Sequence, residues 1–179
     1  MTGTAENYIS RETRSRFRRQ ARQVWSAAAI FTFAWLILIA IAPVSRTAGR
    51  IGLADLVYGF FGFLCHQMPE RSLHLAGEPL AVCSRCFGVY FGLFAGVLVY
   101  PLFKPVDAIE PRSRLWLFAS LLPIGADWAS GVLGIWDNTH LSRFGTGAIL
   151  GAVCAFYIVP AAVELVRSLA YRRALKRAA

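Results

Sequence analysis

The sequence is poor in charged residues, and acidic side chains are especially scarce. Only 16% of the 179 residues are charged, whereas a soluble domain is typically about 25% charged. Hydrophobic residues make up 56% of the chain, and the mean hydropathy is +0.50. This balance excludes an ordinary cytosolic domain. The chain is also too short to hold a separate soluble catalytic domain beside several membrane spans.

Four apolar segments carry the excess hydrophobicity, and each is close to the roughly 20 residues that cross a bilayer core of about 30 Å. They cover residues 24–42, 87–103, 115–135 and 144–163. The sequence therefore predicts an all-α integral membrane protein with about four transmembrane helices in a single membrane domain, 24–166. A further apolar stretch, 51–64, is too short to span, so we expect a re-entrant or interfacial segment there.

The net charge of +9 is unevenly distributed along the chain. Six of the 19 Lys and Arg residues precede the first span, three lie in 104–114 and five follow the last span. Fourteen therefore fall on one side of a four-span arrangement and five on the other. The positive-inside rule predicts a multi-pass protein of the cell (inner, cytoplasmic) membrane with both termini cytoplasmic. Residues 1–23 and 167–179 are expected to be basic tails that contact anionic lipid headgroups rather than nucleic acid.

Glycines at four-residue spacing mark the second and fourth spans. The second span contains Gly88, Gly92 and Gly96, and the fourth contains Gly147 and Gly151. Lipid tails compete with apolar side chains for helix surfaces, so close backbone approach at small residues is a main source of association between membrane helices. We therefore expect these two spans to pack tightly against each other.

Cysteine is rare, yet three of the four cysteines lie between the first and second spans. The segment 44–86, expected to be an outer loop, contains Cys65-His66 and the pair Cys83-x2-Cys86. Three sulfurs and an imidazole are ligands that Zn²⁺ and other thiophilic transition metals prefer. The spacing predicts that Cys65, His66, Cys83 and Cys86 bind one metal ion.

Several alternatives to this ligand set stay open. His74 in the same loop, or His140 between the third and fourth spans, could replace His66 as the fourth ligand. An extracytoplasmic Cys83-x2-Cys86 pair at a helix start also suits a membrane thiol–disulfide oxidoreductase, although an electron relay needs a second cysteine pair. A third hypothesis is a non-catalytic membrane partner subunit whose cysteine cluster fastens the outer loop. Association with a membrane partner protein, or with further copies of the chain, is left open.

Asp127 is the one charged residue in the third span. An ionisable group inside a membrane is costly, so we expect it to face the bundle and to have a partner. Arg85 and Arg143 each precede a glycine-rich span and are the expected partners. Because intramembrane charge is functional by default, these three residues are candidate catalytic residues, with a structural ion pair as the alternative.

Two motifs resemble those of a family of small prokaryotic integral membrane proteins known only as a domain of unknown function. The first is Cys-His-Gln-x-Pro-x-Arg-Ser at 65–72, and the second is Cys-x-Arg-Cys-x-Gly-x-Tyr-x-Gly at 83–92. Further matches are Pro123, Asp127, Asn138, Arg143 and Thr146-Gly147. The resemblance covers roughly residues 65–151. It implies the membrane architecture and brings no established activity.

The charge distribution leads to a test of topology. Reporter fusions after Arg46, Lys104 and Thr139 and at the C-terminus should report outside, inside, outside and inside, in that order. An enzyme active only outside the cytoplasm and a fluorescent protein that matures only inside it provide complementary readouts. Any other order contradicts the predicted orientation and moves the cysteine-rich loop to the reducing side of the membrane.

Overall fold

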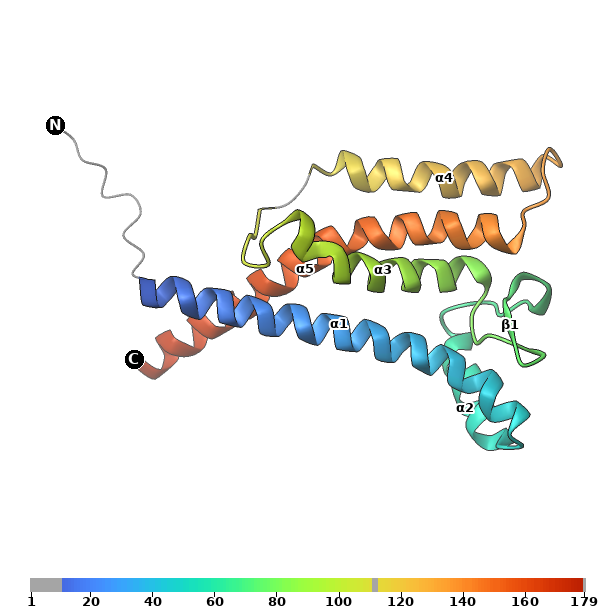
Figure 1. The fold of residues 1–179 in the computed structure, drawn as a ribbon, viewed down its shortest axis with the longest axis horizontal. Helices are drawn as coiled ribbons and strands as arrows, with labels where there is room; N and C mark the ends of the chain where they lie inside the picture. Colours follow the sequence, from blue (N-terminus) through green and yellow to red (C-terminus); the bar gives the residue numbers. More distant parts are fainter. Residues whose placement is uncertain (1–10, 111–112, 179) are drawn as a thin grey trace.

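Helices dominate the computed structural model, which describes residues 11–110 and 113–178. The helices are α1 (Arg11–Thr47), α2 (Ile51–Gly62), α3 (Ser84–Phe103), α4 (Leu115–Val132) and α5 (His140–Ala178), shown in Figure 1. All except α2 are long and apolar enough to cross a membrane. The all-α membrane architecture with about four spans, predicted from the sequence, is confirmed.

The helix limits differ from the limits of the apolar segments. α1 begins at Arg11 and α5 ends at Ala178, so the described parts of both basic tails continue the first and last spans as helix. Residues 1–10 and 179 of those tails lie outside the described residues. α4 ends at Val132, three residues before the predicted limit. Gly134, with φ of +66°, ends it in a left-handed turn that few other residues adopt readily, and the Ile135 amide donates to the Ser130 carbonyl at 3.0 Å.

The contact between α3 and α5 is the closest helix contact, because glycines of each helix lie against the backbone of the other. The facing pairs are Gly88–Phe144, Gly92–Ala148, Gly96–Ala152, Gly147–Arg85 and Gly151–Val89. A methyl group on Gly92 would overlap the carbonyl of Ala148. Both helices advance four residues per contact in the same direction, so they run parallel and begin at the same end of the molecule.

α1 packs against α3 and is coupled to it by a hydrogen bond that a proline makes necessary. Pro101 lies inside α3 and has no N–H, so the Val97 carbonyl four residues earlier loses its helical donor. The indole Nε1 of Trp25 donates to this carbonyl at 2.7 Å. An unpaired carbonyl inside a bilayer costs several kcal/mol, so this bond stabilises the crossing of α1 and α3.

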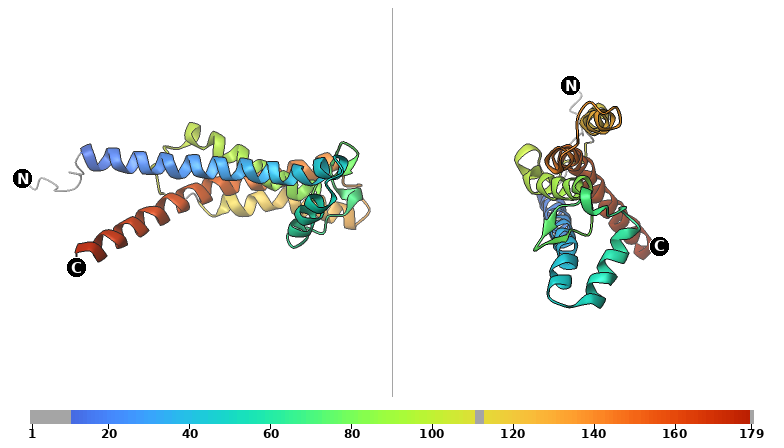
Figure 2. Two further views of the ribbon diagram at one scale, coloured as in Figure 1. Left: turned by 90° about the horizontal axis from the view of Figure 1, so that it is seen from below. Right: turned by 90° about the vertical axis from the view of Figure 1, so that its right-hand side faces the viewer.

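α4 lies on the outer side of α5, away from α1 (Figures 1 and 2). Only Ser120 and Asp127 of this helix are buried within the chain, and large side chains such as Leu122 are 71% exposed. Its one buried acidic residue is Asp127, near its C-terminal end. A membrane helix of this kind exposes most of its surface to lipid and turns its polar face inward.

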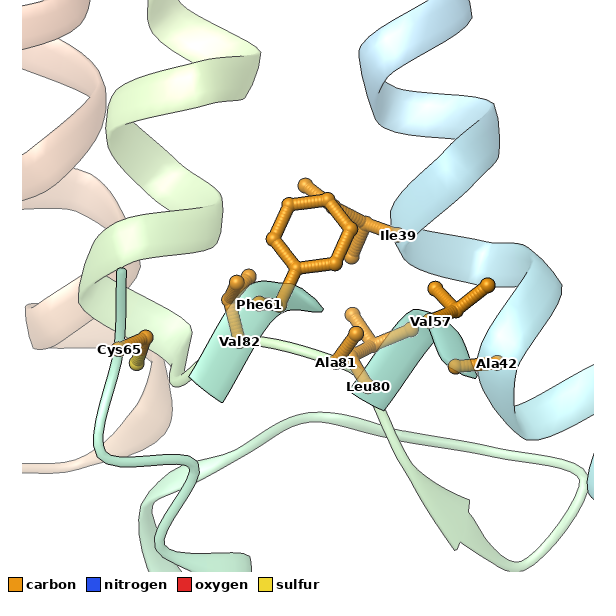
Figure 3. Close-up of a cluster of buried hydrophobic side chains, with 8 residues drawn as sticks. All are labelled: Ile39, Ala42, Val57, Phe61, Cys65, Leu80, Ala81 and Val82. Atoms are coloured by element: carbon orange, nitrogen blue, oxygen red, sulfur yellow. The ribbon is translucent and has the colours of Figure 1, made fainter. Parts of the chain in front are cut away.

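The segment predicted to be re-entrant or interfacial forms α2, a helix of 12 residues. It folds back along the end of α1, where the Arg46 and Asp55 side chains form an ion pair at 3.1 Å. Apolar side chains of α1, of α2 and of the outer loop, mainly from the segment 80–82 before α3, form a buried cluster, drawn in Figure 3. Its members are Ile39, Ala42, Val57, Phe61, Cys65, Leu80, Ala81 and Val82.

A short hairpin closes the outer loop. β1 (His74–Leu75) pairs antiparallel with β2 (Glu78–Pro79). Ala76 and Gly77 join them with φ of +53° and +86°, and positive φ at both positions is typical of the tight turn that matches strand twist. The hairpin returns the chain to the buried cluster immediately before α3.

The glycine contact generates a stability test. Gly92→Leu should lower the free energy of unfolding by about 1–3 kcal/mol, because its side chain would force the α3 and α5 backbones apart. Gly125→Leu is the matched control, since a Cβ atom added at Gly125 in α4 has no atom of a neighbouring segment within 4 Å. Thermal unfolding of the purified protein in detergent measures both. Equal melting temperatures for the two variants would contradict the packing argument.

Candidate metal centre

Three cysteines converge where the outer loop meets the first turn of α3. Cys65 follows α2, Cys83 is the residue immediately before α3, and Cys86 lies in its first turn. Their Sγ atoms all lie within 4.8 Å of one another, and all three thiols are free. Thiolates bound to one Zn²⁺ at about 2.3 Å lie roughly 3.8 Å apart in tetrahedral geometry. Small side-chain rotations would bring this cysteine trio to that spacing.

Gln67 fixes the loop that carries Cys65. Its side-chain Nε2 donates to the carbonyls of Tyr58 at 2.8 Å and of Ala81 at 2.7 Å, so it joins α2 to the segment before α3. Its φ of +51° is uncommon for a residue other than glycine. No role for Gln67 was predicted from the sequence, although its position in the Cys-His-Gln motif is a signal that could have suggested one.

The trio is also linked internally. The backbone amide of Cys83 donates to the Cys65 Sγ at 3.2 Å. Hydrogen bonds from the Cys65 and Cys86 thiols lower the pKa of the Cys83 thiol, the amides of Cys86 and Arg85 act in the same direction, and burial opposes them. The thiolate is the form of cysteine that binds metals and attacks disulfides. The lowered pKa of Cys83 therefore favours its thiolate form.

None of the three predicted histidines belongs to the sulfur group. His66 is exposed and lines a cavity of about 410 Å³ together with the trio. His74 is exposed in the hairpin. His140 lies at the start of α5, where its Nδ1 is 2.9 Å from the hydroxyl of the buried Ser84 and hydrogen-bonded to it. Of the three, only His66 opens onto the same cavity as the sulfurs.

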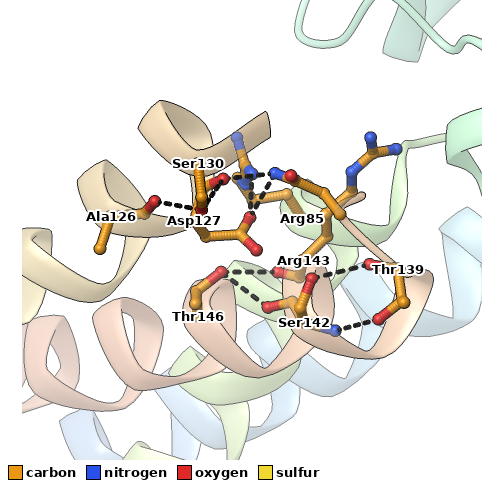
Figure 4. A network of polar contacts seen from close by, with 9 residues as sticks. Arg85, Ala126, Asp127, Ser130, Thr139, Ser142, Arg143 and Thr146 are labelled. Atoms are coloured by element: carbon orange, nitrogen blue, oxygen red, sulfur yellow. Dashed lines mark hydrogen bonds and ion pairs between the residues drawn. The ribbon is translucent and has the colours of Figure 1, made fainter. Parts of the chain in front are cut away.

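Asp127 is held by groups from two other segments, as Figure 4 shows. Its carboxylate, in a side chain only 6% exposed, forms an ion pair with Arg85 of α3. The Asn138 amide donates to the Asp127 carboxylate at 3.0 Å and to its backbone carbonyl at 2.6 Å. Asn138 was identified from the sequence only as a match to the family motif, and its hydrogen bonds to Asp127 were not predicted.

Arg143, the other predicted partner of Asp127, forms no ion pair within the described part of the chain. It lines a second cavity, of about 460 Å³, together with Arg71 and Arg85. The sequence-predicted residues thus divide into two neighbouring groups, the cysteine trio and the Asp127–Arg85 pair. Cys83 and Cys86 line both cavities.

The ion pair leads to a test of its structural contribution. Asp127→Asn should lower the free energy of unfolding by about 3 kcal/mol, because it leaves the Arg85 guanidinium without its buried counter-ion. Arg85→Gln should cost a similar amount, and the double variant should lose less than the sum of the two. Unfolding in detergent provides the readout. Strict additivity would show that the two side chains act independently.

Comparison with known proteins gives the chain a family context. A family model described as "Predicted membrane protein (DUF2085)" matches residues 65–157. An uncharacterized protein, MJ1492, of Methanocaldococcus jannaschii is 36% identical over 110 residues, which cover 62% of this chain and 70% of the relative. An uncharacterized protein of Methanothermobacter thermautotrophicus is 33% identical over 91 residues, covering 51% and 80%. No solved structure matches. The matched region contains the cysteine trio and Asp127.

Proposed function

The chain belongs to the DUF2085 family of predicted membrane proteins, and we propose that Cys65, Cys83 and Cys86 together bind one thiophilic metal ion. Zn²⁺ is the first candidate, and another transition metal is the alternative. The family and the four candidate spans make this a multi-pass membrane protein. The proposed site lies where α3 and α5 begin, an end that the charge distribution assigns to the extracytoplasmic side.

The convergence of three sulfurs is the observation that carries this proposal. They come from positions 21 residues apart in sequence, and yet all lie within 4.8 Å of one another as free thiols. Two of them sit at the positive end of α3, which favours thiolates. The Cys65 and Cys86 thiols donate hydrogen bonds to Cys83, and a divalent cation bound to the three sulfurs would displace their protons and compensate the charge of the thiolates.

The cavity beside the trio favours an accessible ion over a purely structural one. Structural zinc sites are closed by four protein ligands, whereas catalytic sites keep one position for water or substrate. Here three sulfurs line about 410 Å³ of space, and His66 is exposed at its wall. The fourth position is therefore open to water, to a ligand or to the His66 imidazole, which suits metal-dependent chemistry or metal handling.

A second candidate function is thiol–disulfide exchange by Cys83 and Cys86. The observation in its favour is the lowered pKa of the Cys83 thiol at the start of α3. Low-pKa cysteines in Cys-x2-Cys pairs at helix N-termini are typical of disulfide oxidoreductases. The buried Cys65 beside the pair would then act as a third sulfur in the exchange.

Metal analysis separates these functions. Protein purified in mild detergent should contain about one metal ion, and a chelator should release three additional reactive thiols. Cys83→Ser should lower metal occupancy at least about tenfold, because a hydroxyl is a poor ligand for a soft ion. His66→Ala should have a smaller effect, since water can take the fourth position. Elemental analysis and thiol titration provide the readouts.

Cys154→Ser is the matched control. Cys154 lies in α5 outside the trio, so this variant should keep the metal content of the parent. Full metal occupancy in the double variant Cys83→Ser, Cys86→Ser would overturn the ligand set. Metal-free protein with one reducible disulfide would instead support the oxidoreductase.

A further inference from the structure

A second cavity adjoins the cysteine trio and is rich in arginine. It measures about 460 Å³ and is bounded by the first turns of α3 and α5, the end of α4 and the outer loop. Its basic side chains are Arg71, Arg85 and Arg143, and its one acidic side chain is Asp137. Cys83 and Cys86 form part of the wall that it shares with the cavity beside the trio.

The positive charge of this cavity is only partly compensated. Arg85 is paired with Asp127. Over residues 11–110 and 113–178, the guanidinium groups of Arg71 and Arg143 form no ion pair or hydrogen bond, and Asp137 forms no ion pair with any arginine. Arg143 is half-buried. Removing a guanidinium from water without an anionic partner is costly, so this cavity has unused capacity for an anion.

Two further features favour an anion at this place. The Nε atom of Arg85 is buried and has no hydrogen-bond partner, although nearly all buried donors in proteins have one. In addition, α3 and α5 run parallel, so the positive ends of both helix dipoles lie at this end of the molecule. Both effects lower the free energy of a negative charge placed among the three guanidinium groups.

We propose that this cavity binds a phosphate-type oxyanion, either free in solution or carried by a lipid headgroup. The three guanidinium groups come from three different segments, and a tetrahedral oxyanion offers acceptor oxygens in more directions than a planar carboxylate does. Each arginine fork suits bidentate binding of such oxygens. Trp128 and Val132 of the membrane helix α4 line the same cavity and provide an apolar wall for an attached organic group. This site goes beyond the metal proposal and does not depend on it.

The test measures binding of two probes to the full chain in detergent. Inorganic phosphate is titrated by calorimetry at constant ionic strength in chloride. Phosphatidylglycerol is compared by mass spectrometry of the intact protein with diacylglycerol, which has the same chains without the phosphate. Arg71→Gln and Arg143→Gln should each weaken binding about tenfold, because each removes a charge-assisted contact.

Arg50→Gln is the matched control, since Arg50 is exposed at the same end of the molecule and does not line the cavity. If the two cavity variants bind phosphate more weakly and phosphatidylglycerol as the parent does, the ligand is a free oxyanion. If they bind only phosphatidylglycerol more weakly, the ligand is a lipid headgroup. Equal binding of both probes by the parent and all three variants overturns the proposal, as does an equal loss in all three. Oxyanion binding that persists in metal-free Cys83→Ser protein keeps this inference standing even where the metal proposal fails.

Discussion

The close approach of α3 and α5 determines where the candidate site of this molecule lies. Because glycines of each helix meet the backbone of the other in parallel register, both helices begin at the same end. Their first turns carry Arg85 and Cys86 on one helix and Arg143 on the other. A shift of one residue in either helix would rotate its side chains by about 100° and separate these groups. The register of an apolar contact therefore sets the geometry of a polar site.

The outer loop contributes Cys65, the third sulfur of the site. The buried cluster of α1, α2 and residues 80–82 holds the loop against the bundle, and Cys65 is itself a member of that cluster. Gln67 then joins two segments through its side-chain amide, which donates to the Tyr58 carbonyl in α2 and to the Ala81 carbonyl before α3. Apolar burial brings the loop back to the bundle, and polar contacts fix the position of Cys65 within it.

The features that could be predicted are those that depend on residues close together in the sequence. The contacts that depend on how distant segments pack could not be predicted. The four spans are contiguous apolar runs, which composition reveals directly. The partner of Asp127 depends on how α3 lies relative to α4, so spacing alone left Arg85 and Arg143 equivalent. The positions of the histidines also depend on contacts between distant residues. His74 is exposed in the hairpin at 74–79, and His140 is hydrogen-bonded to Ser84. Residue types predicted a sulfur cluster, but they did not decide its fourth ligand.

The cysteine trio and the arginine-rich cavity beside it share one electrostatic constraint, the balance of charge at this end of the bundle. Parallel α3 and α5 place two positive helix ends, Arg85 and Arg143 at one end of the bundle, and the outer loop adds Arg71. Like charges gathered there destabilise the fold. Asp127 compensates part of this charge through Arg85. Thiolates at the start of α3 and an oxyanion near Arg143 have the sign that compensates the remainder. The glycine-to-backbone contact also leaves no space between α3 and α5 at these positions, so the polar groups lie at the end of this helix pair and not along its interface.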